Sequence, residues 1–407
     1  MGPPRTRVDH RDLYLWLEGY RLLADQLGDK RRARWRAGRE HFPRYQSPFI
    51  RTSTNHYALW ASTVYLAGIV FGNGEWEELG GRVMEALRRG TEFQMYFTWP
   101  DGTPVEVIND RNRRWRVDPW GLLALLRRTP IRGVPHHVLP EGQDGLEMLE
   151  QIAQNALYYH ERPTAPIPQD RPQFSYRMRV PAGIRKREPW TIALSGLINA
   201  QPAMNQFFLD RQCHLSIFHE KLGLIVSGAN SKRQPELATF RETVRGRTSH
   251  LPISTALRME PGLDRLSLAY NTFFADLEVS EPSSQQVAFH FAVTEMGRVE
   301  EAQLAIQLVL RPGELLETGA TRVVLGLDRV ELGPDNVAGV IGHRGWSLRV
   351  DSPARLVWPV FPYNPYANAP ETSLGLAVGV LTVPIRPQDV GGRFRKQDVR
   401  FVLEATK

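Results

Sequence analysis

Apolar residues recur at helical spacing over the first part of the chain. From Asp12 to about His160 they return every three or four residues, which is typical of helices that bury one face. One helix is predicted to begin at Thr54 and to stop at the Gly-Asn-Gly turn 72–74, and the next to run from about Glu75 to Phe93. The first apolar stripe comprises Leu13, Leu15, Trp16, Tyr20, Leu23 and Leu27, and two shorter helices are expected over 118–128 and 144–160.

The pattern changes after ERPTAPIPQDRPQ, residues 161–173, which holds four prolines and no apolar periodicity. Beyond it, short runs such as QVAFHFAVTEM and TRVVLGLDRVEL alternate apolar and polar residues or are rich in β-branched residues. The chain is therefore predicted to be an α+β multidomain protein. We expect an α-helical domain over 1–165, a linker over 166–180 and a large antiparallel β-sandwich over 181–407.

Composition narrows the classes of partner. The chain has 407 residues, a net charge of +7 and a sequence pI near 9.6, which favours anionic partners. The arginines are dispersed and form no recognised nucleic-acid motif, so we expect no nucleic-acid partner. No run of about 18 apolar residues occurs and the N-terminus has no apolar signal core, so we expect no membrane association. Cys213 is the single cysteine, which excludes an internal disulfide and a cysteine-based zinc cluster.

The stretch RTSTNHYALWASTVYLAG, residues 51–68, places Asn55 and His56 in the first turn of an otherwise apolar helix. The first N–H groups of a helix lack intrahelical partners, and the positive end of its dipole stabilises anions. This is a position where a bound carboxylate is expected. The alternative is that both residues complete the cap begun by Thr54 and pack under Tyr57, and spacing alone leaves both interpretations open.

A second candidate cluster lies between Phe93 and Gly121. Aromatic rings interleaved with guanidinium groups suit a sugar-acid cleft, because rings stack on sugar faces and arginines pair with carboxylates. The alternative is a solvated loop whose arginines and aspartates pair with each other. The cluster contains Tyr96, Trp99, Glu106, Asp110, Arg111, Arg113, Arg114, Trp115 and Trp120.

A third stretch, residues 205–240, contains Cys213, His214 and His219 on a predicted strand. Neighbouring strand residues point to opposite faces, so Cys213 and His214 are not expected to form a catalytic dyad. The two histidines lie five residues apart and also point to opposite faces, so they are not expected to share a metal ion. We predict no metal site and no cofactor.

Taken together, these features resemble the heparinase II/III-like and alginate-lyase-like polysaccharide lyases. The Asn-His pair at a helix start, a PDG-x-x-x-E loop with arginines, the proline-rich linker and the many-stranded sandwich carry the resemblance. In motif it covers Thr54–Tyr57, Pro100–Trp115 and Leu209–Gly228. It implies an incomplete (α/α) toroid followed by a β-supersandwich, with a cleft between them, and a periplasmic or extracellular location, although this chain has no signal peptide.

The resemblance also implies roles for particular residues. Asn55 would neutralise the uronate carboxylate and His56 would take the C5 proton. Trp115 stands where these lyases usually have a catalytic tyrosine, so Tyr96 or Tyr57 would have to supply the acid. The residues implied to contact substrate are Glu106, Arg111, Arg113, Trp99, Trp115 and His214.

The implied function is β-elimination on an acidic, uronate-containing polysaccharide. The alternative is a non-catalytic carbohydrate-binding or scaffold protein that retains the lyase fold. Hydrolysis by Glu106 and Asp110 is a further option, but residues four apart in a loop have no defined separation. The sequence predicts neither the polysaccharide nor the oligomeric state.

Overall fold

The computed structural model describes most of the helical start of the chain and most of its second half. The described residues are 10–37, 54–101, 103, 105–107, 168–196, 213–228, 234–295, 297, 300–364, 369–370, 372–386, 388–390 and 394–406. The chain divides into two compact units, Met1–Phe93 and Gln94–Lys407. Each unit is described by itself.

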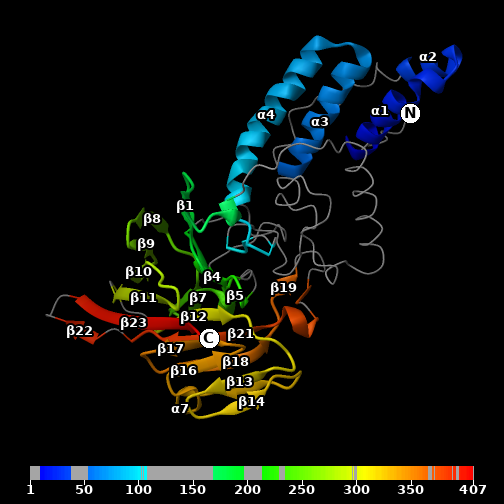
Figure 1. Cartoon of the computed structure of the whole chain (residues 1–407). Helices are drawn as coiled ribbons and strands as arrows, with labels where there is room; N and C mark the ends of the chain where they lie inside the picture. Colours follow the sequence, from blue (N-terminus) through cyan, green and yellow to red (C-terminus); the bar gives the residue numbers. More distant parts are fainter. Residues whose placement is uncertain are drawn as a thin grey trace. The chain divides into compact units, whose positions relative to one another are not determined.

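The first unit is helical (Figure 1). Its elements are α1 (His10–Leu23), η1 (Ala24–Gln26), α2 (Asp29–Ala37), α3 (Thr54–Phe71) and the larger part of α4 (Gly74–Tyr96). Leu17 of α1 packs with Trp60, Val64 and Phe71 of α3 in a small hydrophobic core. No helix in the described ranges is long and apolar enough to cross a membrane.

The connection between α3 and α4 follows the sequence prediction closely. α3 begins at Thr54, as predicted, and Gly72 beyond its end has a φ of +67°, which a glycine adopts without strain. The side chain of Asn73 accepts the backbone N–H of Trp76 at 3.2 Å and so caps the start of α4. A Cβ at Gly68 would collide with the backbone of Glu77, so this glycine allows the two helices to approach closely.

The second unit is built on two large antiparallel sheets (Figure 1). Within the described residues, the first sheet has the order β1-β2-β3-β4-β5-β12-β21-β18-β15, with β6 beside β12 and β7 beside β6. Its strands are β1 (Gln173–Arg177), β2 (Ala182–Arg187), β3 (Trp190–Ser195), β4 (Leu215–His219), β5 (Gly223–Ser227), β6 (Phe240–Val244), β7 (Arg247–Ser249), β12 (Glu301–Leu308), β15 (Val330–Leu332), β18 (Arg355–Val360) and β21 (Val378–Pro384).

The second sheet has the order β14-β13-β16-β17-β23-β11-β10-β9-β8 in the described residues, with β22 beside β23. Its strands are β8 (Ser254–Glu260), β9 (Leu263–Ala269), β10 (Phe273–Ser280), β11 (Gln286–Glu295), β13 (Leu315–Thr318), β14 (Arg322–Val324), β16 (Val340–His343), β17 (Trp346–Val350), β22 (Gln388–Val390) and β23 (Phe394–Ala405). A separate pair joins β19 (Tyr363–Asn364) to β20 (Ala369–Pro370), and the short helices are η4 (Pro168–Asp170), η5 (Pro235–Leu237), α7 (Pro334–Val337) and η6 (Leu374–Leu376).

Both sheets contribute to one hydrophobic core. Trp190 and Ile217 of the first sheet and Phe291 and Phe401 of the second belong to the same cluster of buried residues. Strand β11 buries every second residue, the pattern of a strand with one covered face. In contrast, β3 and β4 are buried along their whole length, so the outer face of the first sheet is also covered there. The segment that covers this outer face forms part of the candidate site.

The expected antiparallel sheets are confirmed, but an (α/α) toroid is not: the described residues contain few helices. The predicted helices over 118–128 and 144–160 lie outside the described residues. The compact units divide after Phe93, upstream of the expected boundary near residue 165, and the domain limits stay a prediction. Strand β1 occupies part of the expected linker because FSYR, after Pro172, alternates half-buried aromatic and exposed polar residues.

Candidate functional site

A short loop of the second unit covers the outer face of β3 and β4. We call residues 97–107 the Trp99 loop. It folds back on itself: the N–H of Trp99 donates to the carbonyl of Thr103 at 2.7 Å, and the N–H of Val105 donates to the carbonyl of Phe97 at 3.0 Å. The Asp101 carboxylate accepts the N–H of Thr103 at 2.9 Å and the hydroxyl of Thr103 at 2.6 Å, which adds a local contact within the loop.

Trp99 and Glu106 fasten this loop to the first sheet. The indole of Trp99 stacks on Phe218 of β4, with ring centroids 5.5 Å apart and planes 12° apart. Its Nε1–H donates to Glu106 Oε2 at 3.1 Å, and the same oxygen accepts the hydroxyl of Ser216 at 3.5 Å. A Cβ at Gly228 would lie 2.8 Å from Val107 Cγ1. Glycine at this position therefore allows the chain after β5 to pass close to the loop, where a larger residue would collide.

The burial of these two side chains changes their predicted role. Trp99 is 0% exposed and Glu106 is 2% exposed. A side chain that stacks on or pairs with a bound polysaccharide needs an exposed surface, and these two have none in this structure. Their contacts instead fix the loop that leads into the arginine-rich segment. The sequence analysis interpreted residues 93–121 as one exposed cleft. It did not identify Ser216 and Phe218 as the residues of β4 on which the Trp99 loop packs.

Tyr96 lies at the end of α4, next to the Trp99 loop and within the second unit. Its ring stacks on Tyr176 of β1 with centroids 4.1 Å apart and planes 9° apart, and it meets Phe174 edge to face at 5.5 Å. Gln169 of η4 donates to the carbonyl of Thr98 at 2.8 Å and also to that of Met95. Tyr96 is only half-buried, so it is reachable from solvent in a way that Trp99 is not.

Other predicted site residues belong to two stretches of the sequence, 55–57 and 111–115. Arg111, Arg113 and Trp115 lie outside the described residues. The backbone of Asn55, His56 and Tyr57 forms the first turn of α3, as predicted, but their side chains lie outside the described part of the structure. Their roles stay predictions.

His214, predicted to contact substrate, is 1% exposed and lies between the two sheets. Its Nδ1 lies 2.8 Å from the carbonyl oxygen of Ser195, which can only accept, so Nδ1 carries the proton. Nε2 then accepts the hydroxyl of Tyr270 at 3.0 Å. Burial, followed by the nearby Glu242, raises the pKa of Tyr270, which keeps that hydroxyl protonated. These contacts account for His214 as a neutral structural side chain.

This arrangement predicts a loss of stability in acid. Burial lowers the pKa of His214 to about 4, below its ordinary value of 6.5. The unfolded chain therefore binds more protons between these values, and the stabilisation present above about pH 6.5 is lost as the pH falls toward about 4. His214 alone should make the free energy of unfolding roughly 2 kcal/mol smaller at about pH 5 than at about pH 7.

Urea unfolding of two variants measures this contribution. His214→Asn should lower the stability at neutral pH but flatten its fall in acid, because the titrating ring is gone. Tyr270→Phe should lower the stability and keep the fall, because it removes a hydrogen bond but leaves the buried imidazole. If the free energy of unfolding falls equally steeply with decreasing pH in the wild type and in His214→Asn, the loss of stability in acid is not due to His214.

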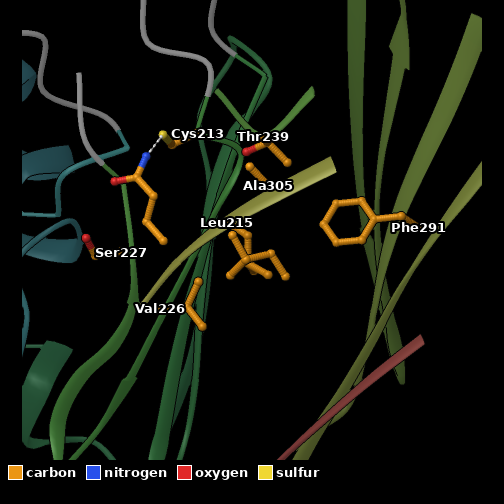
Figure 2. A pocket seen from close by; sticks show the side chains of 9 residues that line it. Cys213, Leu215, Val226, Ser227, Thr239, Phe291 and Ala305 are labelled. Carbon is orange, nitrogen blue, oxygen red and sulfur yellow. Dashed lines mark hydrogen bonds between the residues drawn. The ribbon is translucent and has the colours of Figure 1, made fainter. Parts of the chain in front are cut away.

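The other residues of this stretch are also accounted for by packing. Figure 2 shows a small cavity in the core, with Cys213, Leu215 and Ala305 on the first sheet's side and Phe291 of the second sheet across from them. Gln307 donates its amide to the Cys213 sulfur at 2.8 Å and to the carbonyl of Leu237 at 2.6 Å. The residues that line this cavity are buried and mostly apolar, so it does not offer a sugar-binding site.

His219, the last residue of β4, makes contacts that are separate from those of His214. Its ring meets Trp190 edge to face at 4.6 Å, and its Nδ1 accepts the N–H groups of Lys221 and Leu222 at 3.2 and 3.3 Å. Burial lowers the pKa of His219 as well. Among the described residues, no group of three or more His, Cys, Asp or Glu side chains is arranged to hold a metal ion.

Comparisons with known proteins complete this picture. No protein-family model matches the sequence, and no curated protein sequence matches it either. Among solved structures, a heparinase III is similar with 11% identity and a TM-score of 0.48, covering 97% of this chain and 66% of that one. A second heparinase III structure has 12% identity and a TM-score of 0.47, covering 99% of this chain and 62% of that one.

The chondroitin AC lyase of Streptomyces coelicolor A3, solved in complex with chondroitin sulphate, is 10% identical with a TM-score of 0.47, over 97% of this chain and 66% of that chain. This chain thus spans less than two thirds of the length of these three structures. At such identities and TM-scores, the similarities establish neither a shared activity nor a shared fold.

Proposed function

We propose that this protein is a polysaccharide lyase that cleaves an acidic, uronate-containing polysaccharide by β-elimination. In this reaction a base takes the proton at C5 of the uronate. The electron pair forms the C4–C5 double bond, the bond from C4 to the glycosidic oxygen breaks, and an acid protonates that oxygen. The proton at C5 is weakly acidic until the charge that develops on the carboxylate is stabilised, so the site needs a cation or hydrogen-bond donors at the carboxylate.

Each task is assigned to a residue whose side chain has the chemistry that the task requires. Asn55 donates to the carboxylate from the first turn of α3, where the helix dipole adds to the effect. His56 is the base, because its ordinary pKa lies near neutrality. Tyr96 is the preferred acid and Tyr57 the other candidate, since Tyr96 combines a phenol with partial exposure.

One observation carries the proposal: the Trp99 loop is attached to the first sheet by the stacking of Trp99 on Phe218 and by the hydrogen bond between Trp99 and Glu106. In the sequence this loop comes immediately before the segment that contains Arg111, Arg113 and Trp115. Guanidinium groups recognise carboxylates with two parallel hydrogen bonds, and an indole offers a face for a sugar ring. A rigid base for such a segment lowers the entropy lost on binding. Trp99 and Glu106 are proposed to support the site without contacting the polymer.

The second candidate function is non-catalytic binding of the same polymers. It is favoured by Trp115, which stands where the lyases have a catalytic tyrosine and cannot exchange a proton at neutral pH. The two functions share the anionic polymer and differ only in proton transfer.

Incubation with a panel of uronate polysaccharides separates them. A lyase should produce a steady rise in ultraviolet absorbance from the new conjugated double bond, and His56→Ala should abolish most of it. If the protein only binds, no absorbance develops, and Arg111→Ala should weaken affinity more than His56→Ala, because the arginine holds the carboxylate while the base has no proton to take. Reducing ends that appear without this absorbance would indicate hydrolysis and contradict the lyase.

A further inference from the structure

Three basic residues, Arg311, Arg344 and Lys221, belong to three chain connections that meet near the buried His343. Arg311 follows β12, and its backbone N–H donates to Nε2 of His343 at 3.0 Å. His343 in turn places Nδ1 2.9 Å from the carbonyl of Leu315. Arg344 is the next residue after His343, in the turn between β16 and β17. The imidazole therefore ties the connection after β12 to this turn.

The turn between β4 and β5 adds Lys221. A Cβ at Gly345 would lie 3.4 Å from Leu222 Cδ2, so the two turns are in contact. The N–H of Val309 donates to the carbonyl of Ile225 at 2.9 Å. This bond holds the segment that leads to Arg311 beside β5, which follows the turn that contains Lys221. Lys221, Arg311 and Arg344 are all exposed.

The positive charge at this point is incompletely balanced. In the described part of the chain, no carboxylate lies within ion-pair distance of Arg311, and the Nε of Arg344 is 3.8 Å from Oε1 of Glu314. Glu220, beside Lys221 in sequence, is engaged by Lys186 at 2.8 Å. Burial and then the neighbouring Arg344 lower the pKa of Arg311, while Glu314 opposes them. An added anion would relieve this repulsion.

The backbone places Arg344 at the tip of the hairpin formed by β16 and β17. Arg344 has a φ of +46° and Gly345 a φ of +83°, and they form the two-residue turn between the paired residues His343 and Trp346. The first position of such a turn strongly favours asparagine, aspartate or glycine. Arg245 and Gly246 form the same kind of turn between Val244 and Arg247, so an arginine-glycine pair is a recurrent turn in this chain.

We propose that Arg311, Arg344 and Lys221 form a second anion-binding site on the sandwich, which takes a sulfate ester or carboxylate group of an acidic polysaccharide. Two guanidinium groups and an ammonium group offer the donors that such oxyanions require. The site deepens the proposed function by adding a contact for the polymer, and it rests on that function only for the identity of the polymer. Binding here requires no elimination.

Calorimetric titration of the full chain with dextran sulfate and with carboxymethyl dextran tests the site. Neither polymer contains a uronate, so neither can undergo the proposed elimination. Arg311→Gln and Arg344→Asn should each weaken binding of at least one polymer by about tenfold, the effect of losing a charge-assisted hydrogen bond. Arg344→Asn should melt at or above the wild-type temperature, because asparagine suits the left-handed turn position.

Arg322→Gln is the matched control, because Arg322 is an exposed arginine that pairs with Glu317 at 2.9 Å on β13 and β14. It should bind both polymers like the wild type. Equal losses in the control would mean unspecific attraction and overturn the proposal, as would unchanged affinity in Arg311→Gln and Arg344→Asn or no binding by the wild type. Inorganic sulfate that binds as tightly per site as dextran sulfate would overturn the polymer as the ligand. Failure of the lyase itself would appear only in the absorbance assay on uronate polymers.

Discussion

An Asn55→Ala variant is expected to cleave a uronate polysaccharide about 100-fold more slowly than the wild type, or worse, with little change in melting temperature. The expected size is that found when a donor to a developing oxyanion is removed. The stability should change little because a side chain that faces a cleft leaves no buried partner unsatisfied when it is truncated. Initial rates at saturating polymer and thermal melts measure the two effects.

Asn73→Ala provides the matched control, because Asn73 also lies at a helix N-terminus. Its side chain caps α4 through the N–H of Trp76, so its loss should cost about 1 kcal/mol of stability and leave turnover unchanged. If Asn55→Ala instead behaves like Asn73→Ala, with lost stability and full activity, then Asn55 is a cap and the cleft assignment is wrong.

Asp264→Ala is expected to destabilise the sandwich by about 3 kcal/mol. Asp264 of β9 is 3% exposed and holds Arg185 of β2 through two hydrogen bonds of 2.7 and 2.6 Å, so the pair joins the two sheets. Removing one partner of a buried pair leaves the other charge without compensation. Arg185 keeps some exposure, which places the expected loss at the lower end of the range for such pairs.

Urea unfolding with a double variant tests this explanation. Arg185→Met with Asp264→Leu should recover much of the loss, because two apolar side chains leave no unpaired charge. Glu317→Ala, which breaks the exposed pair with Arg322, should change the stability by less than about 0.5 kcal/mol. A double variant as unstable as Asp264→Ala would show that shape, and not charge, sets the cost.

The sequence predicted the local elements better than the surroundings of particular side chains. The start of α3 and the alternation of β11 could be read from capping residues and periodicity because both depend on nearby residues. Periodicity predicted opposite faces for His214 and His219. In the structure His214 precedes β4 and bonds Tyr270, and His219 packs on Trp190, which belongs to the same core as Tyr270. Periodicity also could not predict that β4 is buried along its whole length, because this requires the Trp99 loop to cover Phe218 on one face and the second sheet to cover the other.

The same limit applies to the candidate site. The aromatic and charged residues after Tyr96 were recognised as one cluster, but Trp99 and Glu106 turned out to be its buried base. Composition alone does not distinguish a ring that binds a sugar from a ring that packs on Phe218. Asp264 was overlooked for a related reason: its partner Arg185 is distant in sequence, so nothing local indicated that a carboxylate would be buried there.

The mass of the reaction products tests elimination most directly. The full chain would be incubated with a uronate polysaccharide in water labelled with heavy oxygen, and the oligosaccharides analysed by mass spectrometry. The proposed lyase gives products whose new non-reducing end is lighter by one water than a saturated end, with no label at the cleaved bond, and His56→Ala stops their formation. Products with a saturated non-reducing end and heavy oxygen at the cleaved bond, or a polymer bound but left intact, would contradict the account.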